Sequence, residues 1–472
     1  MAQQHRQRLS AIDASFLANE SPTSHMHVGA LVILEGPPPP FDEFLDGLRA
    51  RLHMVPRYRQ RLAQHAGGRP LWIDDPDFNL EYHVRQTALP RPGSESQLTR
   101  LTARIMSQQL DRTKPLWEVW LVEGVEGDRV AMISKTHHAL IDGVSGVDLA
   151  TVMFDLSPVP ADLEEETAGL EPWTPSPVPS APELVAGGVA GLARTALGLA
   201  TGALGAITRP QETVAQAREA VEGIGEIVWA GLNPAPDTPL NVEIGPHRRF
   251  TGVRCELEDF KRVKNAFGGT VNDVVLTVVS GALRGWLRSR GVRTEGLEMR
   301  ALVPVSIRAP HEHGELGNRI AAMRAPLPVY VEDPIARLGV VKEEMDGLKD
   351  SKQAVGAEVL AGVQNFAPPT ILAQAARINF STRLFNLIVT NVPGPQFPLY
   401  VRGREMLDVF PVAFLPKGHA LAVAIMSYNG GLNFGLLGDF DAMPDLDRFA
   451  DGLREALAEL VSLAARGEHA VT

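Results

Sequence analysis

The residues with the clearest chemical potential lie close together, a little under a third of the way along the chain. His137 and His138 are followed, after three further residues, by Asp142 and Gly143. An imidazole with an ordinary pKa near 6.5 can take a proton from a hydroxyl group at neutral pH, which contributes roughly 10²–10⁴-fold to a rate. The reaction that suits such a base is transfer of an acyl group to an alcohol, in which a polar donor stabilises the oxyanion. The pattern therefore predicts a general-base site.

Covalent catalysis and metal catalysis are less well supported by the sequence. No G-x-S-x-G nucleophile motif is present, and the single cysteine, Cys255, lies in an alternating, strand-like run. We therefore expect direct acyl transfer without an acyl-enzyme. Adjacent histidines on a strand point to opposite faces and no H-E-x-x-H motif occurs, so we expect no metal site and no cofactor. The alternative is that a histidine at a strand end is a hydrogen-bonded core or turn residue.

The surrounding pattern predicts the elements that position the two histidines. Residues 129–136 have the composition of a buried strand that ends at the histidines, so that one imidazole reaches a cleft and the other packs behind it. Apolar residues after Gly143 follow helical spacing, with Ser145 as the expected N-cap. Gly143 suits a bend between strand and helix, and Asp142 can fix that bend or meet a distant arginine.

Segments along almost the whole chain match one family. They are residues 9–16, 25–29, 110–118, 137–143, 271–273, 303–308, 390–395, 427–430 and 441–445. In order and spacing these segments resemble the bacterial bifunctional wax ester synthase/acyl-CoA:diacylglycerol acyltransferases. That family belongs to the CoA-dependent acyltransferase superfamily, together with chloramphenicol acetyltransferase and the condensation domains of peptide synthetases.

The resemblance implies roles for individual residues. His138 is implied to be the general base and His137 to support the site. Asp142, beside Gly143, is implied to be mainly structural, through a salt bridge to an arginine that the sequence does not identify. The substrate-binding candidates are Trp117, Asn272, Asp273, Ser306, Arg308 and Asn391.

Two of these candidates have structural alternatives. Asn272 and Asp273 stand at the start of a predicted helix, so an N-cap explains Asn272 as well as substrate contact does. Trp117 follows Pro115 at the start of a predicted strand, and core packing explains it better than substrate contact.

Composition and charge restrict the class of protein. The chain has 472 residues, 44% hydrophobic and 21% charged, enough for more than one domain with a substantial core. The net charge of −11 argues against a nucleic acid partner. A single cysteine excludes an internal disulfide framework, and the polar first eight residues contain no secretory signal, so we expect a cytoplasmic protein.

One short segment carries a cluster of arginines, although the chain as a whole is acidic. The cluster consists of Arg49, Arg51, Arg57, Arg59 and Arg61. Such a cluster can bind anionic lipid headgroups or the phosphates of CoA. The commoner explanation is a helix face neutralised by acidic residues from elsewhere in the fold.

The layout predicts two α/β halves. Residues 1–157 alternate strands and helices, a Pro-rich linker and helical insert cover 158–247, and 248–472 alternate again. With the resemblance, this indicates two chloramphenicol-acetyltransferase-like domains of α/β sandwich type with the active site at their interface. Residues 184–207 contain too many glycines and alanines to span a membrane, which leaves a packed helix or a lipid-surface contact.

The combined expectation is an O-acyltransferase at a membrane or lipid-droplet surface. It would transfer a fatty acyl group from acyl-CoA to diacylglycerol or a long-chain alcohol, giving triacylglycerol or wax ester. One alternative is an acyltransferase for a specialised alcohol or polyketide acceptor. Another is a non-catalytic lipid-droplet-binding relative, which the intact His137 and His138 argue against. A homodimer is an open alternative for the assembly.

Overall fold

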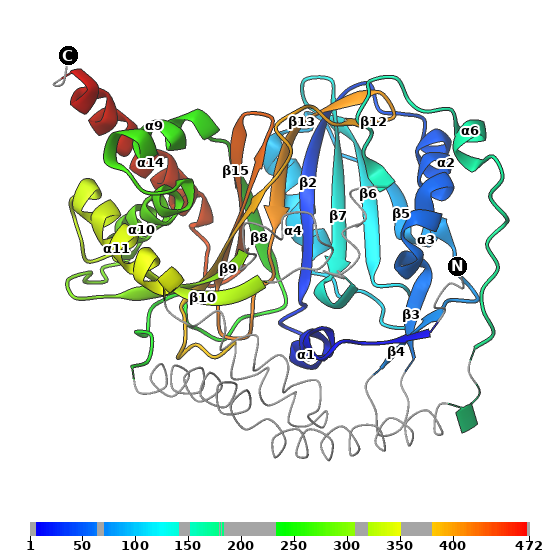
Figure 1. Ribbon diagram of the computed structural model, residues 1–472, viewed down its shortest axis with the longest axis horizontal. Helices are drawn as coiled ribbons and strands as arrows, with labels where there is room; N and C mark the ends of the chain where they lie inside the picture. Colours follow the sequence, from blue (N-terminus) through cyan, green and yellow to red (C-terminus); the bar gives the residue numbers. More distant parts are fainter. Residues whose placement is uncertain are drawn as a thin grey trace, which may run out of the picture.

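Two six-stranded sheets stand side by side in the computed structural model (Figure 1). The structure describes residues 6–63, 70–140, 152–178, 180, 182–183, 233–306, 320–350 and 380–469. The first sheet has the strand order β12-β13-β2-β7-β6-β5, and the second has the order β10-β9-β11-β14-β15-β8. This mixed α/β architecture is the one expected.

The first sheet and its surroundings are built mainly from the amino-terminal part of the chain. Its strands are β2 (His27–Glu35), β5 (Val84–Ala88), β6 (Trp117–Val125), β7 (Arg129–His137), β12 (Tyr400–Val401) and β13 (Arg404–Val412). A small sheet contains β1 (Arg6–Arg8), β4 (Leu71–Asp74) and β3 (Gln60–Ala63). The helices are α1 (Ala11–Asn19), α2 (Phe41–Arg51), α3 (Leu80–His83), α4 (Glu95–Met106) and α6 (Leu163–Thr167), with 3-10 turns η1 (Leu52–Met54), η2 (Pro56–Arg59) and η3 (His138–Leu140).

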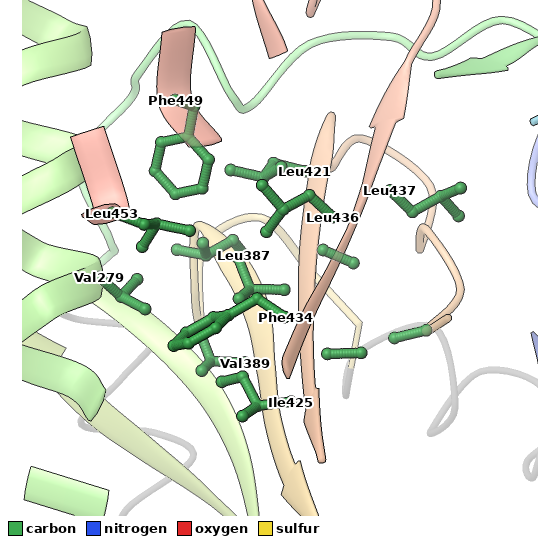
Figure 2. Packing of buried hydrophobic residues seen from close by; sticks show 14 of the residues in the cluster. Val279, Leu387, Val389, Leu421, Ile425, Phe434, Leu436, Leu437, Phe449 and Leu453 are labelled. Atoms are coloured by element: carbon green, nitrogen blue, oxygen red, sulfur yellow. The ribbon is translucent and has the colours of Figure 1, made fainter. Parts of the chain in front are cut away.

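The second sheet is covered by helices on its outer face (Figure 1). Its strands are β8 (Arg248–Val253), β9 (Met299–Ser306), β10 (Ile320–Leu327), β11 (Leu387–Pro393), β14 (Leu421–Tyr428) and β15 (Gly431–Asp439). The helices are α9 (Leu257–Phe267), α10 (Val271–Ser289), α11 (Pro334–Asp350) and α14 (Leu446–His469). Figure 2 shows how the buried side chains of α10 and α14 meet those of β11, β14 and β15.

Alternation along β7 divides its side chains between two cores. Ala131 and Ile133 belong to a core shared with the second sheet, whereas Val130 and Met132 belong to the core on the opposite face of the first sheet. Because strand side chains alternate, a residue at position 137 continues the row of Ala131 and Ile133. The strand predicted over residues 129–136 is confirmed, one residue longer.

Strands β12 and β13 belong to the carboxyl-terminal part of the chain but lie in the first sheet. β13 pairs antiparallel with β2, from Met406 opposite Leu34 to Val412 opposite Gly29. The predicted division into residues 1–157, 158–247 and 248–472 therefore does not separate the two sheets, because residues 400–412 lie in the first one. The described start of the linker lies against the amino-terminal half, where Arg51 pairs with Glu166.

The described helices were compared with the length and hydrophobicity that a membrane-spanning helix needs. None of them is by itself long and apolar enough to cross a bilayer. Helices α9 and α10 meet the length and composition criterion only when taken together, and they are bent by 101° at the break between them. The predictions for residues 184–207 and for a helix capped by Ser145 lie outside the described residues.

Candidate active site

Strand β7 carries the two histidines to its end, next to helix α1 (Figure 1). The backbone N–H of His137 donates to the carbonyl of Leu116 at 3.0 Å, and that of His138 donates to the carbonyl of Met26 at 2.9 Å. The two acceptors directly precede β6 and β2, so both neighbouring strands fix the end of β7. His137 is the last residue of the strand and His138 begins the turn η3.

The imidazole of His138 is half-buried among aromatic rings. It stacks on Phe16 of α1, with ring centroids 3.9 Å apart and planes 20° from parallel. The edge of Phe414, from the segment after β13, lies 5.6 Å away at 88°. Phe16 and Phe414 also contact Phe380, which precedes β11, at 6.1 and 5.7 Å. The ring therefore sits where the two halves of the molecule meet.

Burial keeps this imidazole neutral. It lowers the pKa of His138 from 6.5 to about 4, against a smaller opposing effect of the residue's own backbone carbonyl. Among the described residues, no other residue hydrogen-bonds the ring, and Nδ1 is a buried atom without such a partner. A neutral imidazole with a nitrogen lone pair available is the form that can accept a proton.

His137 is fully buried, and a backbone hydrogen bond fixes its tautomer. The N–H of Ala139 donates to Nδ1 of His137 at 3.0 Å, so the ring proton belongs on Nε2. Nε2 lies 3.7 Å from Oε2 of Glu20. Burial, together with the positive charge of Arg112, lowers the pKa of His137 to about 3. His137 is thus a neutral, buried residue at the end of β7.

Glu20 organises a buried polar cluster behind the histidine pair. Its carboxylate accepts from Nε of Arg112 at 2.5 Å and lies 3.7 Å from Nε2 of His27, which pairs with His137 across β2 and β7. Burial raises the pKa of Glu20, and the charge of Arg112 opposes that shift. Arg112 also donates to the carbonyl of Leu17, which ties it to α1. We call Glu20, His27, Arg112 and His137 the Glu20 cluster.

The Glu20 cluster superficially resembles a metal-ligand set, since it combines two histidines with a carboxylate. Its carboxylate is already occupied by the guanidinium of Arg112. Within the described part of the chain, no group of three or more His, Cys, Asp or Glu side chains is arranged to hold a metal ion.

A second set of predicted residues meets at the start of α10. Nδ2 of Asn391, on β11, donates to Oδ1 of Asn272 at 3.5 Å. Thr270 and Asp273 form a capping box, in which Thr270 Oγ1 accepts from the N–H of Asp273 at 3.2 Å and Asp273 Oδ2 accepts from the N–H of Thr270 at 2.7 Å. The N-cap is therefore Thr270, and the N-cap alternative for Asn272 is wrong. Helix initiation explains Asp273.

Sequence comparison assigns this arrangement to a family. The wax ester synthase/diacylglycerol acyltransferase catalytic domain matches residues 9–275, and the C-terminal domain of the same family matches residues 316–461. The chain belongs to this family. The match to the catalytic domain includes both histidines and Asn272.

Named relatives of the acyltransferase family align over nearly the full length. The chain is 34% identical to the probable diacylglycerol O-acyltransferase tgs1 of Mycobacterium tuberculosis over 464 residues, covering 97% of this chain and 96% of the relative. It is 35% identical to the probable diacylglycerol O-acyltransferase tgs2 of the same organism, covering 95% and 97%.

Solved structures agree on the fold. The wax ester synthase/diacylglycerol acyltransferase from Marinobacter aquaeolei VT8 superposes with a TM-score of 0.68 at 30% identity, covering 97% of this chain and 100% of that chain. The first condensation domain of the CDA synthetase superposes with a TM-score of 0.57 at 18% identity, covering 98% of both, which shows a shared fold.

The other residues predicted to belong to the active site of this acyltransferase do not lie together in the described structure. Trp117 is buried, donates from Nε1 to the carbonyl of Tyr58 at 2.7 Å and stacks on His83 at 4.7 Å. These contacts support the core-packing alternative for Trp117. Ser306 ends β9 opposite Ile320 of β10. Asp142, Gly143 and Arg308 lie outside the described residues, so their roles stay predictions.

The arginine cluster is largely neutralised from within the protein. Arg49 pairs with Asp46, Arg51 pairs with Asp155 and Glu166, and Arg61 lies 3.5 Å from Asp75. Arg57 lies over the ring of Trp72 at 5.0 Å and Arg59 over that of Trp173 at 4.7 Å. The explanation by internal pairing accounts for this cluster without a phosphate ligand.

Sequence reasoning missed the partners of the two histidines. Phe16, His27 and Arg112 lie in segments that matched the family, and Glu20 lies between two of them, but no role was assigned to these residues. Glu20 is the C-cap of α1 and has an extended backbone, so its four-residue separation from Phe16 gave no helix-face signal. No local pattern indicated that Phe414, nearly 280 residues away, would reach His138.

Proposed function

We propose that this chain transfers a fatty acyl group from acyl-CoA to a hydroxyl group, with His138 as the general base. The class of reaction follows from the family: acyl transfer to diacylglycerol or an alcohol gives triacylglycerol or wax ester. The observation that carries the residue assignment is the neutral, half-buried imidazole of His138 at the meeting point of the two halves.

The proposed reaction is a direct transfer. The acceptor hydroxyl attacks the thioester carbonyl while the imidazole of His138 takes the hydroxyl proton. A carbon–oxygen bond forms, the tetrahedral oxyanion collapses, and the carbon–sulfur bond breaks. The CoA thiolate then receives the proton from His138 and leaves as the free thiol. We propose that Nε2 is the nitrogen that takes the acceptor's proton, because Nδ1 is buried.

The supporting role of His137 follows from its contacts. Because the N–H of Ala139 binds Nδ1, the ring of His137 cannot rotate without losing a buried hydrogen bond. It thereby fixes the first residues of the turn that carries His138. Asp142 is proposed to have a structural role, and no metal or redox cofactor enters the proposal.

Both proposed acceptors are insoluble in water, so we propose that the protein works at a lipid surface. The support is the chemistry of the substrates. Co-sedimentation with phosphatidylcholine vesicles, with and without dioleoylglycerol, tests this part separately. We expect the protein to sediment with the vesicles; protein that stays in the supernatant under all conditions contradicts it.

Acceptor-dependent thiol release tests the proposed activity. Purified protein is incubated with palmitoyl-CoA, and free CoA thiol is followed with and without dioleoylglycerol or hexadecanol. We expect thiol release only with acceptor, in equal amount to the triacylglycerol or wax ester formed. Thiol release without acceptor would indicate hydrolysis. No release with any acceptor would favour a lipid-binding relative, and activity restricted to another hydroxyl compound would favour a specialised acyltransferase.

A further inference from the structure

Helix α1 and its C-cap residue, Glu20, contact the two histidines of the pair. Ser10 caps the start of this helix by accepting from the N–H of Asp13 at 3.0 Å. At the other end, the carboxylate of Glu20 lies 3.7 Å from Nε2 of His137. Between them, Phe16 stacks on His138. The helix is thus placed by contacts at both ends, and Phe16 has a defined position over the imidazole.

The imidazole of His138 has few other restraints among the described residues. No other described residue hydrogen-bonds the ring, in contrast to His419, where Nδ1 and Nε2 each meet a carbonyl at 3.1 Å. For His138 the described restraints are ring contacts: the face of Phe16 and the edge of Phe414. A nearly parallel stack at 3.9 Å limits rotation about the side-chain torsions of both rings.

We propose that Phe16 is a positioning residue, whose ring holds the imidazole of His138 in the orientation needed to take the acceptor's proton. This inference rests on the proposed role of His138 as base. A general base acts only within hydrogen-bond reach of the proton, and a displacement of about 1 Å can cost on the order of 10²-fold in rate. Phe16 acts through His138 and takes no part in bond making or breaking.

A plain packing role for Phe16 predicts a different set of effects. Phe16 packs against both hydrophobic cores, so its loss lowers stability in either case. A side chain that only lines the acyl or acceptor pocket would change KM more than kcat. A positioning residue lowers kcat with little change in KM for either substrate.

The test compares Phe16→Leu, which keeps an apolar side chain but removes the aromatic face, with Phe16→Tyr, which retains the face. We expect Phe16→Leu to lower kcat for palmitoyl-CoA with hexadecanol by about 10-fold to 100-fold at nearly unchanged KM. Phe16→Tyr should recover most of that loss. A wild-type kcat in Phe16→Leu, or an effect confined to KM, overturns the proposal.

The chain offers a matched control in a second phenylalanine–histidine stack. Phe78 lies on His83 with centroids 5.4 Å apart and planes 15° from parallel, and the other described rings that contact His83 are those of Tyr82 and Trp117. Phe78→Leu removes the same kind of contact. We expect it to lower the thermal midpoint without changing kcat. An equal fall in kcat in Phe78→Leu would show that the Phe16 effect is general destabilisation, and would overturn the proposal.

A readout without turnover separates this inference from the proposed function. Carbethoxylation of His138 by diethylpyrocarbonate, followed by peptide mass spectrometry, reports how well the ring is covered. We expect faster modification of His138 in Phe16→Leu and an unchanged rate in Phe78→Leu. An unchanged rate in Phe16→Leu contradicts the positioning contact. If the wild type itself shows no acceptor-dependent thiol release, the proposed function fails whatever the modification rates.

Discussion

Two adjacent histidines of one motif have different surroundings because strand β7 ends between them. His137 is the last strand residue and faces the buried core, with a backbone donor on Nδ1. His138 begins a turn and lies between rings from both halves of the molecule. The alternation of strand side chains, read from the sequence, predicted that one histidine would pack behind the other.

The pKa of His138 makes a prediction for the pH dependence of catalysis. A base with a pKa of about 4 stays neutral well below pH 6.5. We expect kcat/KM to be nearly flat between pH 7.5 and 5.5, whereas an unshifted imidazole with a pKa near 6.5 would give a fall of about 10-fold at pH 5.5. The measurement is the pH profile of kcat/KM for palmitoyl-CoA, with circular dichroism at each pH to confirm the fold. A fall with an apparent pKa near 6.5 contradicts this environment for His138.

At the residue level the sequence predicted the strand that ends at the two histidines but not the side chains around His138. Phe414 follows strand β13, which lies in the first sheet, and its ring reaches His138, whereas Phe380 precedes β11 and reaches Phe16. Such a contact has no local signature. Trp117 has a buried hydrogen bond to Tyr58, which supports the core-packing alternative that the sequence already favoured.

Between elements, Lys135 joins β7 to the end of α4. It is fully buried, pairs with Glu118 of β6, and donates from Nζ to the carbonyls of Ile105 and Gln108 at 2.9 and 3.0 Å. These carbonyls lie at the carboxyl end of α4, where a positive charge is favourable. Burial lowers the pKa of Lys135, and the charge of Glu118 opposes the shift.

Removing this lysine is expected to destabilise the fold strongly. Among the described residues, Lys135→Met leaves the buried carboxylate of Glu118 with Arg85, at 3.3 Å, as its one cationic partner, and we expect a loss of about 3 kcal/mol in the free energy of unfolding. Urea unfolding measures it. The double variant Lys135→Met/Glu118→Gln is the control, and it should recover part of the loss because the unpaired charge is gone. A single variant as stable as the wild type would show that the pair contributes nothing.

The elements themselves were largely predictable where hydrophobic periodicity was strong. The strand at 129–136 and the helix starting at Val271 are both present: the strand has a short continuous apolar run, and the helix repeats its apolar residues at helical spacing. The cap of that helix is Thr270, which rules out the N-cap alternative for Asn272. Asn272 is a good capping residue by type, but the box formed by Thr270 and Asp273 satisfies two backbone donors and sets the start.

Across the whole molecule, strands β12 and β13 of the carboxyl-terminal part lie in the first sheet and thereby join the two halves. Tyr428, on β14, donates to the carbonyl of Met406 at 2.9 Å and accepts from the N–H of Leu399 at 2.8 Å, which anchors the crossing strands. Gly435 on β15 approaches so closely that a Cβ there would lie 1.7 Å from the carbonyl oxygen of Pro411. The predicted boundaries missed this crossing, because pairing between distant segments leaves no composition signal.

Buried histidines distributed over both halves make folding sensitive to acid. Burial lowers the pKa of His83, His138 and His419 to about 4 and that of His137 to about 3. An unfolded chain, with histidine pKa values near 6.5, binds more protons between pH 6.5 and about 4, so stability is full above pH 6.5 and falls as the pH drops through this window. The slope is about 1.4 kcal/mol per pH unit for each histidine.

Urea unfolding at pH 7.5 and 5.5 measures this loss, and the free energy of unfolding should be lower at pH 5.5. His83→Phe, which keeps the aromatic stack on Trp117, removes one titrating group and should reduce the difference by about 1.4 kcal/mol at most. Equal stability of the wild type at the two pH values contradicts the buried, neutral state of these histidines.

If the imidazole of His138 takes the acceptor's proton, its loss must slow turnover, and kcat of the His138→Ala variant measures this most directly. The assay follows CoA thiol release from palmitoyl-CoA with hexadecanol, and circular dichroism confirms that the variant is folded. We predict a fall in kcat of about 10²-fold to 10⁴-fold, with His83→Phe retaining wild-type turnover as the histidine control. A folded His138→Ala variant with a kcat close to that of the wild type would contradict the account.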